Sequence, residues 1–163
     1  MKPMFRTGGL AALAAAMMTL GGCVIADVEG VDVTSTPEVE HFTGVAKAGM
    51  DLPFSKAVRV DDTIYLSGEL GIDPATGKLV DGDTAAQAEQ ALKNIMVILM
   101  EENMSMHNVA QVQVFLADIA DFAAVNEVYK TFFAEPYPAR AAIQAGALPA
   151  GANVEILVTA VKD

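Results

Sequence analysis

The stretch of residues 112–140, VQVFLADIADFAAVNEVYKTFFAEPYPAR, carries the clearest fold signals of the chain. In its first part the residues Val112, Val114 and Leu116 alternate with the residues between them. In an extended chain the alternate residues point to opposite faces, so this period of two predicts a strand.

The second part of the same stretch predicts an amphipathic helix, because its apolar residues recur three or four positions apart. Asp121 stands where the helix would begin and is its expected N-cap. Pro136 and Pro138 predict that the helix has ended before them. The apolar face of this helix consists of Phe122, Val125, Tyr129 and Phe132. We assign these side chains to the core.

The same two periods recur upstream of this stretch. Strand-like residues on both sides of Asp61-Asp62 predict a hairpin, and residues 73–77 predict a turn. Residues 84–103 predict a first amphipathic helix, capped by Asp83 or Thr84.

Two more strand-like runs follow downstream, over about residues 140–148 and 153–161. The predicted order is therefore strand, strand, helix, strand, helix, strand, strand. With these elements, an α+β fold with the helices on one face of a sheet is the economical packing.

The composition excludes several classes of protein. The chain has 163 residues, 53% of them hydrophobic, which suits one domain with its own core. A formal net charge of −11 argues against a nucleic-acid partner, since phosphate binding needs a surplus of Lys and Arg. One Cys and two His offer no disulfide framework and little for a zinc site. We therefore expect no metal and no cofactor.

Residues 1–22 predict a signal peptide. Two basic residues precede an uncharged, Ala-rich run that is too short to span a bilayer stably. The run ends in Leu20-Gly21-Gly22-Cys23, which looks like a bacterial lipobox, whose cysteine is acylated. We expect a cell-envelope protein that faces the periplasm and is held to the membrane only by the lipid on Cys23. The alternatives are an ordinary secretory signal, or a mis-assigned start codon ahead of a cytoplasmic protein.

Residues 23–44 are polar and acidic, and we interpret them as a linker. The folded domain is then residues 45–163. His41 has no second metal-ligand residue at a suitable spacing, so we expect a solvent-exposed linker histidine.

Two charged residues stand out in the C-terminal strands. Arg140 opens an uncharged run, where a guanidinium must be hydrated, paired or used. It could hold a carboxylate ligand through two hydrogen bonds, or equally form a structural ion pair with Glu155 or an acidic loop. Glu155 lies in an apolar strand, where a carboxylate is costly unless it is paired or used in acid–base chemistry. Its alternative is an edge-strand position that faces water.

Ser67-Gly68 closes the second strand of the hairpin, and offers a hydroxyl and backbone groups to a ligand or forms a bulge. Ser67 has no obvious His partner, and the chain lacks a Gly-x-Ser-x-Gly motif, which argues against a serine hydrolase. It also lacks a glycine-rich phosphate or dinucleotide loop.

The chain resembles the RidA (YjgF/YER057c) family over about residues 45–162. Several separate motifs agree with the family in order and spacing: a strand end, a turn, two helices and a C-terminal signature. The segments that carry the resemblance are Tyr65–Glu69, Asp73–Lys78, Ala86–Asn94, Phe122–Tyr129, and Pro138–Leu148 with Val154–Ile156.

The resemblance implies a chorismate-mutase-like α+β fold and a homotrimer with ligand clefts between subunits. It also implies hydrolysis of reactive 2-imino and 2-enamino acids, such as 2-aminoacrylate, to 2-oxo acids and ammonia. By position, Arg140 corresponds to the arginine that binds the substrate carboxylate, and Glu155 to the glutamate that directs water. Ser67 is a further implied catalytic residue, and the other implied substrate-binding residues are Phe54, Gly68 and Asn126.

Two positions depart from the family pattern. Phe54 stands where members often have Tyr, and Ala142 where many have a reactive Cys. Because Phe54 lacks the hydroxyl, a second hypothesis stays open. It is a non-catalytic protein of the same fold, which binds a small carboxylate or acts like a chaperone at the envelope.

Overall fold

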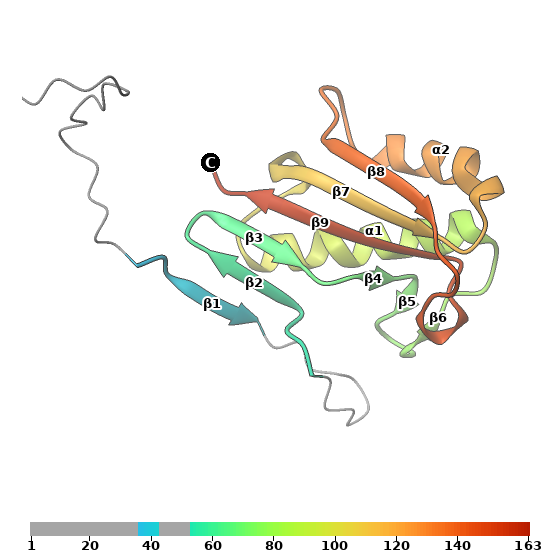
Figure 1. The fold of residues 1–163 in the computed structure, drawn as a ribbon, viewed down its shortest axis with the longest axis horizontal. Coiled ribbons are helices and arrows are strands. Elements are labelled where there is room, and N and C mark those ends of the chain that lie inside the picture. The colour runs from blue at the N-terminus through green and yellow to red at the C-terminus, as the bar shows by residue number, and fades with distance from the viewer. Residues whose placement is uncertain (1–35, 43–52) are drawn as a thin grey trace, which may run out of the picture. The chain divides into compact units, whose positions relative to one another are not determined.

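The computed structural model describes residues 36–42 and 53–163, which contain a seven-stranded mixed sheet, a two-stranded sheet and two α-helices. The larger sheet has the order β1-β2-β3-β9-β7-β8, and β4 also pairs with β9 (Figure 1). The strands are β1 (Val39–Phe42), β2 (Ala57–Val60), β3 (Thr63–Leu66), β4 (Glu69–Leu70), β5 (Ile72–Asp73), β6 (Lys78–Leu79), β7 (Val109–Leu116), β8 (Ala139–Gln144) and β9 (Val154–Val161), and the helices are α1 (Thr84–Glu101) and α2 (Phe122–Phe132). The predicted α+β fold is confirmed.

The predicted signal peptide, the lipobox with Cys23 and most of the predicted linker lie outside the described residues. Of the helices in residues 36–42 and 53–163, neither is long and apolar enough to cross a membrane.

The last part of the predicted linker needs a correction, because it belongs to the sheet. Val39–Phe42 form β1, which pairs antiparallel with β2. His41, predicted to be a linker residue, therefore lies in a strand, and its Nδ1 is 3.2 Å from Ser55 Oγ. β1 was missed because it has only four residues, two of them charged or polar. Such a strand is too short for a period of two to be recognised in the sequence.

β2 and β3 form the predicted hairpin. Asp61 and Asp62 make its two-residue turn, and Asp61 adopts a φ of +50°, in the left-handed region. Such turns match the twist of the strands they join, and aspartate tolerates this conformation.

The stretch 112–140 builds a strand–helix–strand unit. β7 and β8 are parallel, and parallel neighbours need a crossover connection, which α2 provides. β9 then pairs antiparallel with β7 on its other side. β8 ends at Gln144, earlier than predicted, and the N–H of Ala145 still donates to Leu116 O at 2.8 Å. The chain then turns through Pro149–Gly151 into β9.

The two helices begin differently. The Asp83 side chain accepts a hydrogen bond from the N–H of Ala86 at 3.0 Å, so this predicted N-cap is confirmed. Asp121 occupies the N-cap position of α2, but its side chain makes no capping hydrogen bond. Its carboxylate instead accepts the hydroxyl hydrogen of Thr84, at the start of α1. The predicted capping role of Asp121 is therefore wrong, and its side chain ties the two helix starts together.

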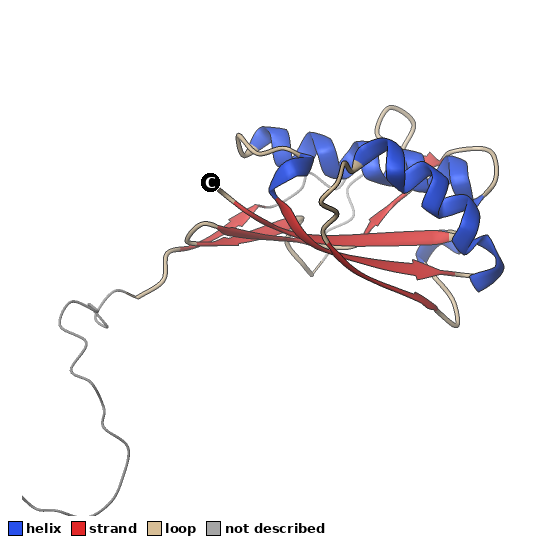
Figure 2. Ribbon diagram, turned by 90° about the horizontal axis from the view of Figure 1, so that it is seen from above, coloured by secondary structure: helices blue, strands red, loops and turns tan. Residues whose placement is uncertain are grey.

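Both helices pack on the same face of the sheet and leave the other face uncovered, as Figure 2 shows. Fully buried core side chains are Ile64, Leu92, Ile95, Leu99, Val112, Val114, Leu116, Val154 and Ile156. The predicted face of α2 is only partly core, because Val125 and Tyr129 are buried but Phe122 is 40% exposed.

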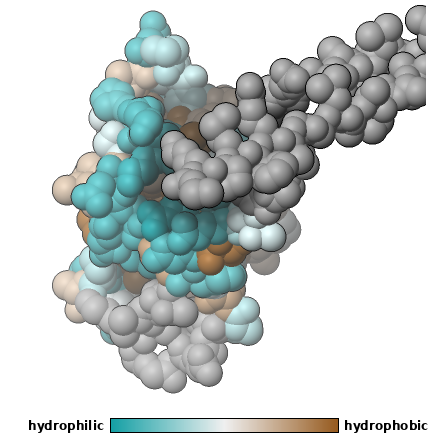
Figure 3. All heavy atoms as spheres, turned by 90° about the vertical axis from the view of Figure 1, so that its left-hand side faces the viewer, coloured by the Kyte–Doolittle hydropathy of each residue, from teal (hydrophilic) through white to brown (hydrophobic). Residues whose placement is uncertain are grey.

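The uncovered face carries exposed apolar side chains. By strand register Val39, Tyr65, Ile143 and Val161 share it, and each is 41–53% exposed. A hollow of about 200 Å³ on this face is lined by residues of β3, β7 and β9. The end of the domain that includes the β2–β3 turn is, in contrast, largely hydrophilic (Figure 3).

Candidate active site

Arg140 lies on β8 against the aromatic face of α2. Because it is in register with buried Val112, its side chain points to the helix-covered face of the sheet. Its guanidinium carbon is 4.5 Å from the ring centroid of Tyr129 and 5.4 Å from that of Phe122. Within residues 36–42 and 53–163 no carboxylate forms an ion pair with it. The alternative of a structural ion pair with Glu155 is therefore wrong.

Two polar atoms on the same face of α2 are buried without a hydrogen-bond partner in the described part of the chain. They are Asn126 Oδ1 and the hydroxyl oxygen of Tyr129. Burial raises the pKa of Tyr129 to about 12, although nearby Arg140 acts to lower it. Tyr129 is thus a neutral phenol at physiological pH. We call Phe122, Asn126, Tyr129 and Arg140 the arginine half-site.

Glu155 lies on β9 in register with Leu70 of β4, close to a break between the two strands that neighbour β9 on this side. β3 pairs with β9 as far as Tyr65, and β4 resumes the pairing at Glu69. Gly68 lies in this break, and a Cβ there would be only 1.8 Å from Oε1 of Glu155. A side chain at position 68 would therefore displace the Glu155 carboxylate, which occupies its space. β9 is an interior strand, so the edge-strand alternative for Glu155 is wrong.

Ser67 connects this break to the segment before β2. Its hydroxyl donates to Ser55 O at 2.7 Å, and its N–H donates to Lys56 O at 3.0 Å. The hydroxyl hydrogen is therefore engaged, and the oxygen keeps acceptor capacity. Phe54, next to Ser55, is 60% exposed. We call Phe54, Ser67, Gly68 and Glu155 the glutamate half-site.

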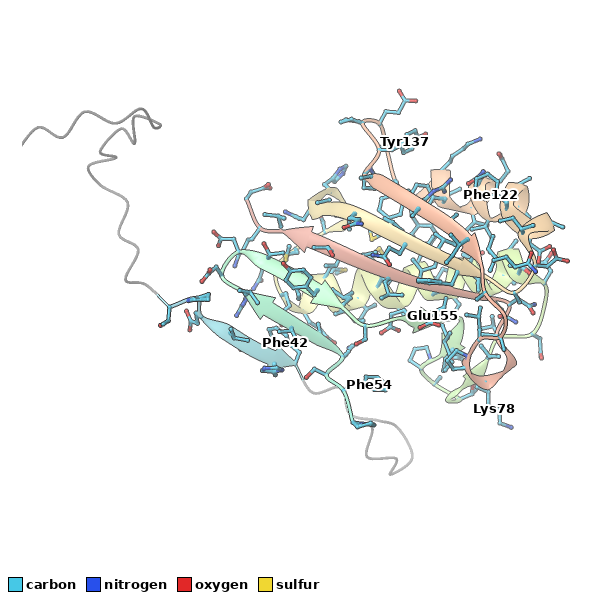
Figure 4. All side chains as sticks on the ribbon, in the orientation of Figure 1. Phe42, Phe54, Lys78, Phe122, Tyr137 and Glu155 are labelled. Atoms are coloured by element: carbon cyan, nitrogen blue, oxygen red, sulfur yellow. The ribbon has the colours of Figure 1, made fainter. Side chains whose placement is uncertain are left out.

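One copy of the chain does not bring the two half-sites together. Arg140 is opposite Val112, which is opposite Val158, and Glu155 is three residues further along β9. β8 and β9 are two strand spacings apart, and the three residues add a rise along β9. Together these distances place the Cα atoms of Arg140 and Glu155 about 14 Å apart. Because Val158 and Glu155 are an odd number of residues apart on β9, the side chains of Arg140 and Glu155 also point to opposite faces of the sheet. Figure 4 labels Phe122 on α2, and Glu155 on β9 beside β4.

Glu69 is a titratable group that the sequence analysis did not single out. It is in register with buried Ile156, so it points to the face that α1 covers, away from Glu155. Burial raises the pKa of Glu69 to about 7, and the positive charge of Lys56 acts against this rise. The sequence did contain a signal for this group: Glu69 is acidic at a position where members of the resembling family carry a Gln-type residue.

The described residues contain no group of three His, Cys, Asp or Glu side chains that could hold a metal ion. The hollow on the uncovered face is lined by no member of either half-site.

A family model, Ribonuc_L-PSP, described as Endoribonuclease L-PSP, matches residues 47–162, which include both half-sites. The chain belongs to this family. The match to the Ribonuc_L-PSP (YjgF/RidA) family confirms the resemblance found in the sequence.

Relatives within the family are similar over most of their length. A Bos taurus protein named 2-iminobutanoate/2-iminopropanoate deaminase is 54% identical over 125 residues, which are 76% of this chain and 91% of that protein. The crystal structure of RidA from Psychrobacter sp. PAMC 21119 is 42% identical with a TM-score of 0.68, covering 75% of this chain and 99% of that one. The crystal structure of E. coli TdcF with bound serine is 31% identical with a TM-score of 0.68, covering 76% and 100%.

Proposed function

We propose that this protein hydrolyses reactive 2-imino and 2-enamino acids of the 2-aminoacrylate type to 2-oxo acids and ammonia. The names of the family relatives, at about 50% identity, support imine deamination. The observation that carries the proposal is the state of Arg140, a cation held against aromatic rings with no carboxylate partner among the described residues.

Arg140 binds the substrate carboxylate. A guanidinium presents a planar fork of N–H donors that matches a carboxylate through two parallel hydrogen bonds. Since Arg140 makes no internal ion pair in the described part of the chain, this fork is free for a ligand. The serine bound in the TdcF structure also carries a carboxylate, which is consistent with such a site in the family.

Glu155 directs the water. An enamino acid first takes up a proton at its β-carbon and becomes the imine. The carboxylate accepts a proton as the water oxygen attacks the imine carbon, and returns it to the nitrogen, which becomes an amine. The hydroxyl proton of the resulting carbinolamine then passes to this nitrogen, the C–N bond breaks, and ammonia leaves as the C–O bond becomes the carbonyl of the 2-oxo acid. Gly68 and Ser67 form the wall of the cleft beside Glu155, and Phe54 and Asn126 are further substrate-binding residues in this proposal. The reaction needs neither a metal nor a cofactor.

The substrate must meet Arg140 and Glu155 at once, and these lie in separate half-sites of one chain. We therefore propose that the arginine half-site of one subunit faces the glutamate half-site of the next, in the homotrimer that the family resemblance implies. A head-to-tail ring of this kind closes with one active site at each interface. The exposed apolar side chains of the uncovered sheet face give such an assembly surface to bury.

We also propose that Cys23 is acylated and anchors the protein at the cell envelope, facing the periplasm. The support is the lipobox-like sequence Leu20-Gly21-Gly22-Cys23 after an uncharged run. Mass spectrometry of the mature N-terminus tests this. A lipid-modified Cys23 as the first residue is expected, and an intact Met1 would place the protein in the cytoplasm.

The activity is tested by generating imino acids with an amino-acid oxidase in the presence of semicarbazide. The wild-type protein should divert the imine from the semicarbazone, and Arg140→Ala should leave semicarbazone formation at the buffer rate. If both proteins behave like buffer, the proposed reaction is wrong. Binding of 2-oxobutanoate to wild type without turnover would then favour the carboxylate-binding hypothesis, to which the missing hydroxyl at Phe54 already points.

A further inference from the structure

In the arginine half-site, the guanidinium of Arg140 lies against the faces of two aromatic rings. Its carbon lies 4.5 Å from the ring centroid of Tyr129 and 5.4 Å from that of Phe122, both within the range of a cation–π contact. Phe122 and Tyr129 are seven residues apart on α2, two helical turns, so they present their rings on one face of the helix. Tyr129 is in turn stacked on Phe133, with ring centroids 4.3 Å apart.

Aromatic rings and a carboxylate differ in how many N–H donors of a guanidinium they leave free for a ligand. A carboxylate partner would occupy part of the guanidinium fork and neutralise its charge. A ring face attracts the cation through its quadrupole and occupies no N–H donor. Tyr129 acts here as a neutral ring, because its phenol stays protonated at physiological pH.

We propose that Tyr129 and Phe122 are positioning residues that hold the Arg140 guanidinium by their ring faces and leave its donors free for a substrate carboxylate. The sequence analysis assigned both side chains to the core. This inference rests on the proposed function for what Arg140 binds, but not for how Arg140 is held.

The first test measures how Arg140 is held, without any substrate. Nitrogen-15 NMR of the full chain records the Arg140 side-chain N–H resonance, assigned by its loss in Arg140→Lys. The wild-type resonance should be displaced by the ring currents of the two aromatic rings. Tyr129→Leu and Phe122→Leu should each shift it toward the value of a free arginine. A wild-type resonance at that free value overturns the proposal, whether or not the protein is an enzyme.

The second test measures what this positioning does to a substrate. Tyr129→Leu should raise KM for the imino acid by about two- to fivefold with kcat nearly unchanged, as expected for one cation–π contact near the surface. Tyr129→Phe should restore the wild-type KM and keep the displaced NMR resonance, since the Tyr129 hydroxyl has no hydrogen-bond partner in the described part of the chain. The matched control is Phe132→Leu, a half-buried aromatic residue of the same helix that does not lie over Arg140.

The two tests separate the failure of this inference from failure of the proposed function. A displaced resonance in a wild-type protein without imine turnover refutes the deaminase and leaves the aromatic support in place. Turnover with the same KM in Tyr129→Leu and Phe132→Leu refutes the positioning role and leaves the deaminase.

Discussion

The arginine and glutamate half-sites hold opposite charges by opposite means. In the arginine half-site, aromatic rings of α2 fill the space next to a guanidinium on β8. In the glutamate half-site, the absence of a side chain at Gly68 leaves the space that the Glu155 carboxylate occupies. Neither charge is neutralised by an ion pair within the described residues, so both stay available for a ligand. Each half-site is therefore built by local packing alone, and in the proposed trimer a second subunit brings the two together.

The largest expected effect comes from mixing two inactive proteins. Arg140→Ala lacks the arginine and Glu155→Gln lacks the carboxylate, so each variant alone should fall to the buffer rate. If each active site combines half-sites from two subunits, co-expressed mixed trimers regain roughly a quarter of the wild-type activity, from interfaces in which both residues are intact. The semicarbazone assay on the co-purified protein measures this. Mixed trimers that stay inactive would show that the half-sites do not meet across an interface.

Gly68→Ala should break the glutamate half-site alone. The new Cβ would lie 1.8 Å from Oε1 of Glu155 and displace the carboxylate. A misplaced general base lowers kcat by about a hundredfold, while binding of 2-oxobutanoate to Arg140 should change little. Gly146→Ala is the matched control, because a Cβ there would meet no atom within 4 Å. Equal kcat values for the two variants, measured under saturating imine, would contradict the role of this gap.

Glu69→Gln should change how stability depends on pH. The pKa of Glu69 is raised to about 7 in the folded protein and is near 4.3 in an unfolded chain, so folding favours the protonated acid. The stability that Glu69 contributes is therefore fully present below about pH 4.3 and is lost as the pH rises through about 7. At about 1.4 kcal/mol for each pH unit between the two pKa values, this loss is at most roughly 3–4 kcal/mol.

Urea unfolding at pH 5 and pH 8 tests this expectation. Glu69→Gln should lose less stability than wild type between the two pH values, and should be the more stable protein at pH 8. Glu89→Gln is the control: it removes an exposed carboxylate paired with Lys93 on α1 and should keep the wild-type change in stability between the two pH values. An unchanged pH dependence in Glu69→Gln would contradict burial as the cause of the shift.

Thr84→Val should have the smallest effect and tests the connection between the helices. Thr84 is 5% exposed and its hydroxyl donates to Asp121, which joins the start of α1 to the start of α2. Losing this hydrogen bond should cost about 1–2 kcal/mol of unfolding free energy. KM and kcat should stay close to wild type, since neither half-site changes. Thr131→Val serves as the control in thermal unfolding, because it removes an exposed hydroxyl that bonds Val128 O within α2 and does not join the two helices.

Much of the fold follows from local patterns. The hairpin around Asp61-Asp62 and helix α1 with its Asp83 cap were predictable because strand period, helix period and capping chemistry are properties of neighbouring residues. β1 was not predictable, since a four-residue edge strand is defined by its partner β2 more than by its own sequence. The role of Asp121 was mispredicted for a similar reason, because Thr84 is 37 residues away in the chain.

The candidate site was predictable as a set of residues but not as an arrangement. Local patterns were enough to predict that Arg140 and Glu155 are conspicuous charges in apolar strands and that Ser67-Gly68 ends a strand. The folded chain alone shows that Arg140 and Glu155 lie on opposite faces, that Gly68 makes room for Glu155, and that the Tyr129 ring lies against Arg140. The physical reason is that periodicity fixes which residues share a face within one strand. The register between strands depends on how their side chains pack together, and no single segment encodes that packing.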